Sequence, residues 1–388
     1  MARSLRVLFI GGPMYDPLYS RLAEFEEREG LTVEVAETLP HPQLNERIEE
    51  EFASGRTSYD LISTHTKYAP SQSEWLTPLD DDLDEAELET FNANTLDLAR
   101  IDGRLYGVPR NLDVKLLYYR TDLMRGAPST WDELLEEGAR LRSEDLYGFA
   151  FPGKESGLFG HFFELHAMAG GRMFTDKNTP APNLDDEAGR WALSLLKDLR
   201  KRAAPKETTE WHYDEVAACF REGKAAMSTD WPGGFYTYED PDQSAVVGAY
   251  DVALYPVGPA GRFVYSSSHT FAIPCTVRDR PAAIALLCFL TSRRSQTIEA
   301  KLGTLPARAD AREDARAAAE AGSLAERRWE LLAETEQAAL VPPKHSNYPA
   351  VEDTIWEGIR EALLGNKSVG QALADTEAAA RHAATTGR

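Results

Sequence analysis

The first part of the chain alternates short apolar runs with helical patterns, and this alternation restricts the fold more than any other feature. Residues 5–10 are mostly apolar, and residues 31–36 and 59–65 are strand-like segments with apolar side chains among polar ones; all three have the length that suits strands. Residues 18–29 and 43–55, which lie between them, repeat apolar side chains at helical spacing. This order predicts an α/β fold with a parallel, doubly wound sheet. In such a sheet the ligand crevice lies at the carboxyl ends of the strands.

The loops at those carboxyl ends are therefore candidates for a ligand site. Met14 and Tyr15 follow the first run, and Thr64 and His65 close the third. A single histidine is more often a structural residue than a ligand contact, so His65 needs support from other positions.

Residues 102–124 are the most informative stretch of the chain. A polar turn leads into a short β-prone piece, which Pro109 must end or leave on a sheet edge. A polar loop with Asn111 and Asp113 follows, and then residues 114–119, which are rich in branched and aromatic side chains. The stretch predicts two strands joined by a polar loop.

Local signals mark the elements that come next. Thr130 is followed three residues later by Glu133, which is the capping-box pattern at the start of a helix. Residues 146–151 form a short apolar run that ends at a Pro-Gly pair, and they predict a further strand.

Length and charge limit the class of protein. A chain of 388 residues is too long for one ordinary core and suggests two lobes. The net charge of −21 argues against a nucleic-acid or membrane-surface partner, because both are bound through clustered Lys and Arg. The cysteines show no C-x-x-C spacing, and we expect Cys275 and Cys288 to be buried thiols because they lie in apolar runs.

The sequence contains no common catalytic or cofactor motif: H-E-x-x-H, the P-loop and G-x-G-x-x-G are all absent. Residues 266–269 place serine hydroxyls beside an imidazole, but a catalytic triad depends on spatial geometry. We therefore expect no catalytic residue, no cofactor and no metal. The 63 acidic residues guarantee many carboxylate pairs, so a carbohydrate-active enzyme remains an alternative.

Several short motifs occur together along the chain. The first group comprises GRLYGVP at residues 103–109, Asp113, LYY at 117–119 and PSTWDEL at 128–134. The second is FREGKAAM at residues 220–227, with Trp231 after it. The third is GTLPAR at residues 303–308. In this combination the chain resembles the family 1 extracellular solute-binding proteins, the sugar-binding components of ABC importers, which include the maltose-binding-protein-like proteins. Two positions depart from the family pattern: Arg120 stands where Asn is commoner, and serines precede His269 where the family usually has a Gly pair.

The resemblance implies the type II periplasmic binding protein fold. This fold has two doubly wound α/β lobes joined by a hinge of two or three crossovers, with the ligand cleft between the lobes. Transferred to this chain, it implies an N-terminal lobe of residues 1–110 and 268–308, and a C-terminal lobe of residues 111–267 and 309–388.

The expected ligand is a carbohydrate, whose flat ring faces and polar rim call for aromatic faces combined with planar donors and acceptors. The resemblance implies that Trp231 is a stacking aromatic and that Asp113 occupies a site position. The full set of expected ligand-binding residues is Trp231, Asp113, Asn111, Tyr348, His65, Thr64, His269, Ser268, Tyr15, Met14, Gly233, Glu164 and Trp211.

The resemblance further implies a monomeric binding protein that closes around a mono- or oligosaccharide and delivers it to the permease subunits of an ABC importer. Such a protein works outside the cytoplasm, as a periplasmic protein or a cell-surface lipoprotein. The apolar piece at residues 5–10 is too short for a signal-peptide core, so the sequence read alone favours a cytoplasmic protein. The resemblance implies instead an exported protein whose signal segment is missing from this sequence, and both interpretations remain open. In an alternative with the same fold, Arg110, Lys115, His65 and Arg262 hold a sugar acid or another small anion.

Overall fold

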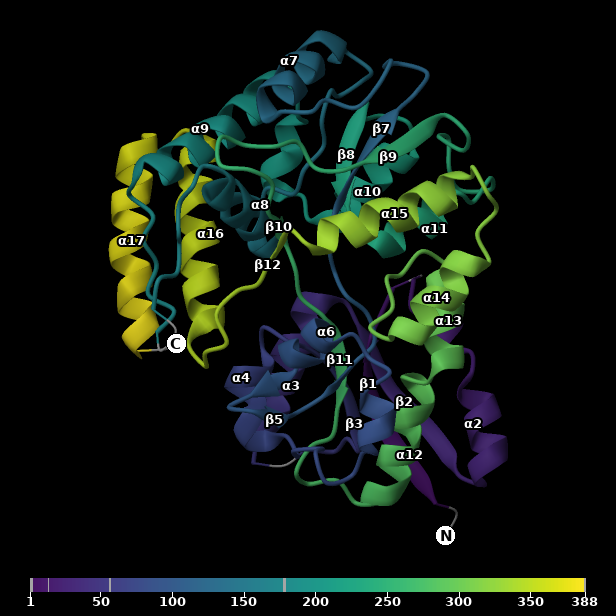
Figure 1. The fold of residues 1–388 in the computed structure, drawn as a ribbon. Coiled ribbons are helices and arrows are strands. Elements are labelled where there is room, and N and C mark those ends of the chain that lie inside the picture. Colours follow the sequence, from purple (N-terminus) through teal and green to yellow (C-terminus); the bar gives the residue numbers. More distant parts are fainter. Residues whose placement is uncertain (1–2, 13, 56, 177–178, 387–388) are drawn as a thin grey trace. The chain divides into compact units, whose positions relative to one another are not determined.

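The computed structural model describes residues 3–12, 14–55, 57–176 and 179–386, and Figure 1 shows its elements. The chain divides into two compact units. Unit 1 comprises Met1–Asp113 and Ser267–Ala319, and unit 2 comprises Val114–Ser266 and Glu320–Arg388. The chain therefore passes from one unit to the other three times. Met1 and Ala2, at the end where the missing signal segment was expected, lie outside the described residues.

Unit 1 combines a five-stranded sheet with short and medium helices. Its strands are β1 (Ser4–Ile10), β2 (Thr32–Leu39), β3 (Leu61–His65), β4 (Arg100–Ile101), β5 (Arg104–Leu105), β6 (Val108–Pro109) and β11 (His269–Ala272). Its helices are α1 (Asp16–Tyr19), α2 (Leu22–Glu29), α3 (His41–Ala53), α4 (Ala69–Gln72), η1 (Ser73–Trp75), α5 (Glu85–Leu88), α6 (Ala93–Leu98), α12 (Arg280–Leu290), α13 (Arg293–Lys301) and α14 (Ala309–Ala317).

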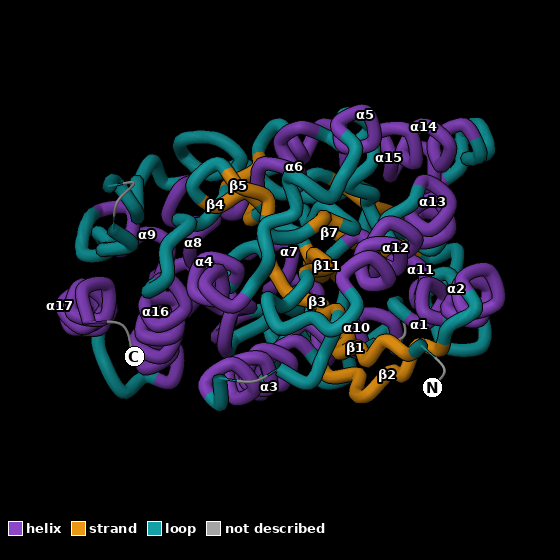
Figure 2. Tube along the Cα trace, turned by 90° about the horizontal axis from the view of Figure 1, so that it is seen from below, coloured by secondary structure: helices purple, strands orange, loops and turns teal. Residues whose placement is uncertain are grey.

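The sheet of unit 1 has the order β2-β1-β3-β11-β6, and Figure 2 shows β2, β1, β3 and β11 in that sequence. Strands β1, β2 and β3 are parallel, as the alternating pattern predicted. Strand β11 is antiparallel to both β3 and β6. It belongs to the segment that returns from unit 2, so it is not part of the strand–helix alternation from which the parallel order was inferred.

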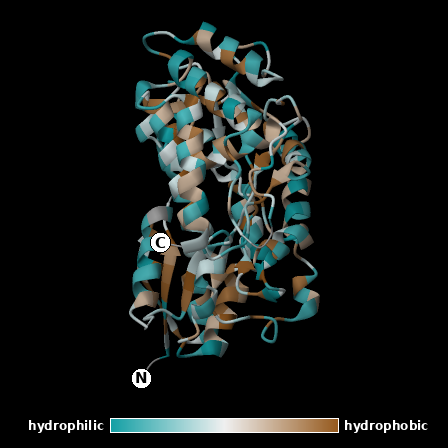
Figure 3. Ribbon diagram, turned by 90° about the vertical axis from the view of Figure 1, so that its left-hand side faces the viewer, coloured by the Kyte–Doolittle hydropathy of each residue, from teal (hydrophilic) through white to brown (hydrophobic). Residues whose placement is uncertain are grey.

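Both faces of this sheet are buried, and strand β1 shows how. Leu5, Val7 and Phe9 point into one apolar cluster, which contains side chains of α2 and α12. Leu8 and Ile10 point into a second cluster with side chains of α3. Successive strand residues face opposite sides, so a continuous apolar run is what a doubly covered strand requires. In Figure 3 the strands next to the N-terminus are coloured as hydrophobic.

Unit 2 contains a three-stranded sheet and the longest helices of the chain. Its strands are β7 (Leu116–Arg120), β8 (Met227–Asp230), β9 (Tyr250–Ala253), β10 (Val264–Tyr265) and β12 (Ala339–Leu340). Its helices are α7 (Trp131–Leu141), α8 (Glu155–Met168), α9 (Glu187–Arg202), η2 (Lys206–Glu210), α10 (Tyr213–Arg221), η3 (Pro232–Gly234), α11 (Phe235–Tyr238), α15 (Leu324–Glu336), α16 (Tyr348–Leu364) and α17 (Val369–Thr386).

The α/β fold in two units is confirmed, but the sheet of unit 2 differs from the expected parallel order. Its order is β8-β7-β9, and β7 is antiparallel to both neighbours. The strand predicted at residues 146–151 is reduced to isolated parallel bridges at Tyr147 and Ala150. The amides of Gly148 and Phe149 donate to the carbonyl of Ala203, after the end of α9, and not to a neighbouring strand. The prediction of a regular strand there was wrong.

Two local predictions can be compared with the structure. The hydroxyl of Thr130 accepts the amide of Glu133, so the predicted N-cap of α7 is confirmed. The Glu133 carboxylate accepts from the Ser129 amide at 2.7 Å, one residue before the position that a strict capping box would use. The prediction for Cys275 was wrong, because this thiol is exposed; Cys288 is half-buried.

None of the helices among the described residues combines the length and the apolar composition that a membrane span requires.

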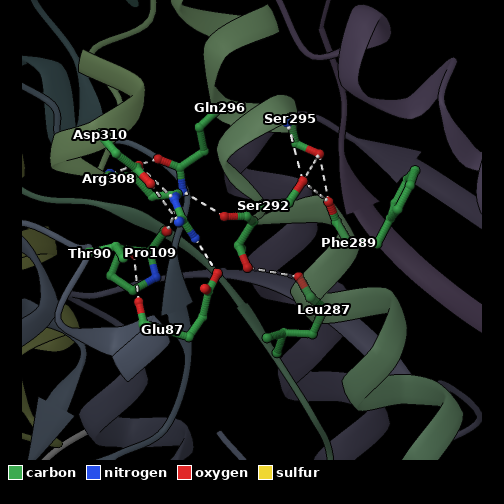
Figure 4. A network of polar contacts seen from close by, with 11 residues as sticks. Glu87, Thr90, Pro109, Leu287, Phe289, Ser292, Ser295, Gln296, Arg308 and Asp310 are labelled. Atoms are coloured by element: carbon green, nitrogen blue, oxygen red, sulfur yellow. Dashed lines mark hydrogen bonds and ion pairs between the residues drawn. The ribbon is translucent and has the colours of Figure 1, made fainter. Parts of the chain in front are cut away.

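A buried glutamine positions the loop that carries Asn111 (Figure 4). Gln296, on α13, donates from Nε2 to the carbonyl of Pro109 at 3.1 Å. Its Oε1 accepts the amide of Arg308 at 2.8 Å. Asn111 pairs with Pro306 through an isolated backbone bridge. The side chain of Gln296 therefore holds the polar loop after β6 against residues 303–308.

Arg308 ties the same network to α5. Its guanidinium donates to both carboxylate oxygens of Asp310, at 2.9 and 2.8 Å, and pairs with Glu87 (Figure 4). Paired, planar contacts of this kind fix an arginine more firmly than a single exposed ion pair does.

Replacing Gln296 with Ala should destabilise unit 1 by roughly 3 kcal/mol, because the buried carbonyl of Pro109 and the buried amide of Arg308 would both lose their partner. Hydrogen exchange resolved along the chain is the suitable measurement, because a two-unit protein need not unfold in one step. Gln371→Ala, at an exposed position of α17, is the matched control and should change stability by less than about 0.5 kcal/mol. Equal protection of the amides of Arg110 and Arg308 in both variants would contradict this role of Gln296.

Candidate functional site

Four of the predicted site residues lie together in unit 1 and are linked by hydrogen bonds. Asn111 donates from Nδ2 to Oδ1 of Asp113 at 2.6 Å, and its Oδ1 accepts the amide of His269 at 3.0 Å. The hydroxyl of Ser268 donates to the carbonyl of Asn111 at 2.6 Å. The segments around residues 111 and 268 are remote in sequence, so these bonds hold the two crossing segments of unit 1 in one register.

The β3–β11 ladder places the predicted histidines opposite each other. His269 pairs with His65 and Thr270 with Thr64, as expected from antiparallel strands. The ring centroids of His65 and His269 are 4.9 Å apart. His41, at the start of α3, lies 5.1 Å from the His65 ring and 5.5 Å from the His269 ring. Ligating atoms of these three side chains lie within 4.8 Å of one another, and among the described residues they are the one such group that could hold a metal.

Burial controls the charge of these groups. It raises the pKa of Asp113 to about 7, although Arg110 and the hydrogen bond from Asn111 oppose the shift. It lowers the pKa of His269 to about 3, helped by the positive charges of Arg110 and Lys67. Burial also lowers the pKa of His65 well below its usual value. Both imidazoles are therefore neutral at physiological pH.

Tyr15 and Arg110 flank the histidines. The Tyr15 ring is 6.1 Å from the His269 ring, in an edge-to-face arrangement. The Arg110 guanidinium lies over the Tyr15 ring, 4.4 Å from its centroid. Arg110 is also paired with Glu299, and both side chains are buried. Tyr15 is thus placed beside the polar cluster, and the charge of Arg110 is balanced within unit 1.

The other two predicted residues of unit 1 lie differently. The Thr64 hydroxyl is buried and donates to Oε1 of Gln72 at 2.6 Å, so it serves the packing of α4. Met14 is half-buried in the turn before α1. The structure shows neither side chain joined to the cluster of Asn111 and Asp113.

In unit 2, Trp231 belongs to a group of aromatic side chains around a buried ammonium group. Its ring lies 5.1 Å from that of Tyr213 and 6.2 Å from that of Tyr265. The Lys115 ammonium is 5.2 Å from the Trp231 ring centroid and donates to the Tyr213 hydroxyl at 3.2 Å. Trp231 is half-buried, so part of its surface remains available to a ligand.

Glu164 is the counter-charge of that ammonium group. Lys115 and Glu164 are both fully buried, with 2.8 Å between Nζ and Oε1. Glu164 also accepts the backbone amide of Tyr265 at 2.7 Å. Burial lowers the pKa of Lys115 and raises that of Glu164, while the attraction between the two favours the charged pair. Glu164 therefore organises the aromatic group from inside the unit.

The turn after β8 is shaped by Asp230. Its Oδ1 accepts the Trp231 amide at 2.7 Å, and its Oδ2 accepts the Tyr238 hydroxyl at 2.5 Å. A Cβ at Gly234 would lie 2.0 Å from Oδ2, so glycine there leaves room for the carboxylate. Gly233, the predicted glycine, is buried in the same turn.

The remaining predicted residues lie elsewhere in unit 2. Tyr348 is fully buried, donates to Glu352 at 2.6 Å and has its ring 6.1 Å from that of Phe159. Trp211 packs edge-to-face on Tyr147, with 6.5 Å between the ring centroids. Neither residue has a ring contact with Trp231.

The sequence analysis did not select several residues that complete these groups, namely His41, Tyr213, Tyr265 and Asp230, and it placed Lys115 only in the anion alternative. His41 had a usable signal, because it follows the end of β2 and the rule of carboxyl-end loops applies to that strand too. Tyr213 and Tyr265 are recognised only from tertiary contacts.

Comparisons with known proteins agree on one family. Residues 11–297 match the family model described as bacterial extracellular solute-binding protein. A probable amino-acid ABC transporter periplasmic-binding protein of Sinorhizobium fredii is 23% identical over 327 residues, which are 80% of this chain and 74% of that protein. The mannitol-binding protein of Pseudomonas aeruginosa is 27% identical over 270 residues, which are 64% of this chain and 60% of that protein. The maltose-bound structure of T. maritima MalE3 has a TM-score of 0.90 and 25% identity, and covers 98% of this chain and 100% of its own.

The stability of unit 2 should depend on pH through Asp230. Burial raises the pKa of this carboxyl to about 7, against the hydrogen bonds from Tyr238 and Trp231. Between about pH 4 and 7 the folded state therefore holds a proton that the unfolded chain has released. The stability of the folded state then falls as the pH rises, by up to about 1.4 kcal/mol for each pH unit. Asp230→Asn removes this titration, so the variant should gain stability relative to the wild type from pH 5 to 8.

Calorimetric melting of both proteins across that pH range tests the prediction. Asp242→Asn, at an exposed position after α11, is the matched control. If the difference in stability between the wild type and Asp230→Asn stays constant from pH 5 to 8, Asp230 is ionised throughout that range and the prediction is wrong.

Proposed function

The chain belongs to the bacterial extracellular solute-binding proteins, and from this premise we propose that it is the carbohydrate-binding subunit of an ABC importer. The motifs had predicted this family, and the match over residues 11–297 covers most of the chain. Its relatives are binding proteins of ABC transporters, and they include a mannitol-binding protein and a maltose-bound structure. The mannitol-binding protein and the maltose-bound structure support a neutral sugar or polyol as the solute.

One observation carries the choice of a neutral solute: the cations near the predicted site are already balanced. Arg110 is paired with Glu299. Lys115 is paired with Glu164, and both side chains are fully buried. An anion that took either cation would leave a buried carboxylate without its partner, which typically costs several kcal/mol.

The other two groups of the anion alternative are also occupied or neutral. Arg262 donates from Nε to the carbonyl of Tyr255 at 2.5 Å and lies 3.7 Å from Glu334. His65 is neutral, because burial lowers its pKa. The charge arrangement therefore favours a solute without net negative charge.

The groups proposed to bind the sugar are chemically complementary to it. Trp231 in unit 2 supplies an aromatic face for the apolar side of a pyranose ring. Asn111, Asp113 and Ser268 in unit 1 supply amide, carboxyl and hydroxyl groups for its rim. In this proposal the hinge closure of the family applies to this chain, and a solute with higher affinity for the closed state shifts the population toward it.

The remaining parts of the proposal follow the family. The protein works outside the cytoplasm as a monomer and passes its solute to membrane permease subunits. It has no catalytic role, so the bound sugar should be recovered unchanged after prolonged incubation, whereas a carbohydrate-active enzyme would release a product.

A thermal-shift screen identifies the solute class. The panel contains neutral sugars, polyols, sugar acids and amino acids, the last because one relative is named as an amino-acid binding protein. A solute that binds only the folded protein should stabilise it by about 2.7 kcal/mol at a concentration of 100 times its Kd. We expect shifts with sugars or polyols. Shifts with acids or amino acids alone would overturn the proposed solute class.

Replacing Trp231 with Ala should weaken binding of the identified sugar by roughly 2 kcal/mol, about 30-fold in Kd, because a central aromatic contact is lost. Titration calorimetry measures the change. Trp356→Ala, on α16, is the matched control and should bind the sugar like the wild type. If Trp231→Ala and Trp356→Ala bind the sugar with equal affinity, Trp231 does not contact the bound sugar.

A further inference from the structure

Three histidines of unit 1 converge from three separate elements. His41 begins α3, His65 ends β3 and His269 begins β11. One ligating atom from each lies within 4.8 Å of the other two. Among the described residues, no other group of three His, Cys, Asp or Glu side chains approaches this closely. We propose that unit 1 binds one divalent first-row transition-metal ion, of the Zn²⁺ type, through His41, His65 and His269.

The spacing is close to that of a coordinated ion. Zinc–nitrogen bonds of about 2.0–2.1 Å in a tetrahedral site place the nitrogens about 3.3 Å apart. The three imidazoles therefore need to move together by only about 1.5 Å, which small side-chain rotations provide. Three imidazoles with an open fourth position form a common catalytic or ligand-accepting zinc arrangement, and that position can take an oxygen of water or of a bound solute.

His269 has the surroundings of a metal ligand. Its Nε2 lies 3.8 Å from Oδ2 of Asp113, and its Nδ1 is buried without a hydrogen-bond partner. A proton on Nε2, on the side of the carboxylate, leaves the lone pair on Nδ1 for a cation. The carboxylate–histidine–metal pattern also needs a hydrogen bond between Nε2 and Asp113, so the two groups must approach by about 1 Å when the ion binds. Asp113 is itself oriented by the amide of Asn111, at 2.6 Å.

The protonation states agree with this geometry. Burial holds His65 and His269 neutral, and a neutral imidazole is the form that coordinates a metal. The amide of Lys67 donates a hydrogen bond to Nδ1 of His65 at 3.2 Å, so Nε2 carries the proton in the metal-free protein. Coordination through Nε2 therefore requires the other tautomer and the loss of this hydrogen bond. Arg110 and Lys67 add positive charge nearby; Glu299 balances the first, and Asp113, close to Nε2 of His269, supplies negative charge in its ionised form.

Imidazole ligands indicate the class of metal. Three nitrogen donors suit Zn²⁺, Ni²⁺, Cu²⁺ and Co²⁺, whereas Mg²⁺ and Ca²⁺ prefer oxygen. The proposal replaces the sequence-based expectation that the chain holds no metal. That expectation came from motif spacing along the chain, and these three residues are brought together only by the fold.

The test uses the full chain without an affinity tag, stripped with a chelator and then loaded with Zn²⁺ or Co²⁺. We expect one ion per chain in equilibrium dialysis, together with the visible absorption bands of tetrahedral Co²⁺. His41→Gln, His65→Gln and His269→Gln should each lose stoichiometric binding. His382→Gln, at an exposed position of α17, should keep it. Asp113→Asn should weaken binding by about tenfold or more, as expected for a second-sphere carboxylate.

Absence of Zn²⁺ and Co²⁺ binding in the wild type, or unchanged binding in all three histidine variants, would overturn the proposal. The cluster would then be an edge-to-face packing of neutral rings. Melting temperatures of the metal-free variants control for loss of folding. Repeating the sugar titration with the chelated wild type separates the two proposals, because sugar binding and metal binding can each fail alone.

Discussion

Strand β11 is the element on which unit 1 depends, because it completes the sheet between β3 and β6. Its two faces enter different apolar clusters: Phe271 packs in one and Ala272 in the other. Backbone groups buried on both sides must find partners within the sheet, so the register of β11 is tightly specified. The same register sets His269 opposite His65, and the amide of Asp113 bonds to the carbonyl of Ser267 just before the strand. The geometry of the polar cluster therefore follows from the register of a strand that is buried on both faces.

Unit 2 is organised by a different constraint, the buried pair of Lys115 and Glu164. Two charges with no exposure are expensive to bury, and such pairs seldom add net stability over apolar replacements. Here the pair also fixes directions: Glu164 holds the amide of Tyr265, and Lys115 holds the hydroxyl of Tyr213. Both rings flank Trp231. The value of the pair therefore lies in defining the position of an aromatic face, which a purely apolar core would leave less defined.

The sequence predicted those features that depend on local pattern. The N-terminal strands and helices were found because their periodicities are clear, and Thr130 because a helix cap needs only its own first turn. Asn111, Asp113, Ser268 and His269 were selected from their places at the expected crossovers, Asp113 also from the family resemblance, and the fold brings them together. Features that depend on distant partners were missed. The antiparallel order of β8-β7-β9 is set by crossing segments, and no local signal distinguishes residues 146–151 from a regular strand.

The charge of the whole chain bears on both proposals. A net charge of −21 produces a field that repels anionic solutes and raises the local concentration of cations. The cations near the predicted site do not reverse this locally, since Arg110 and Lys115 have their own carboxylates. A neutral sugar encounters no barrier in such a field, and a divalent metal ion is attracted by it. The neutral imidazoles of His65 and His269 add no positive charge against that ion, so the long-range field and the local chemistry favour the same kind of ligand there.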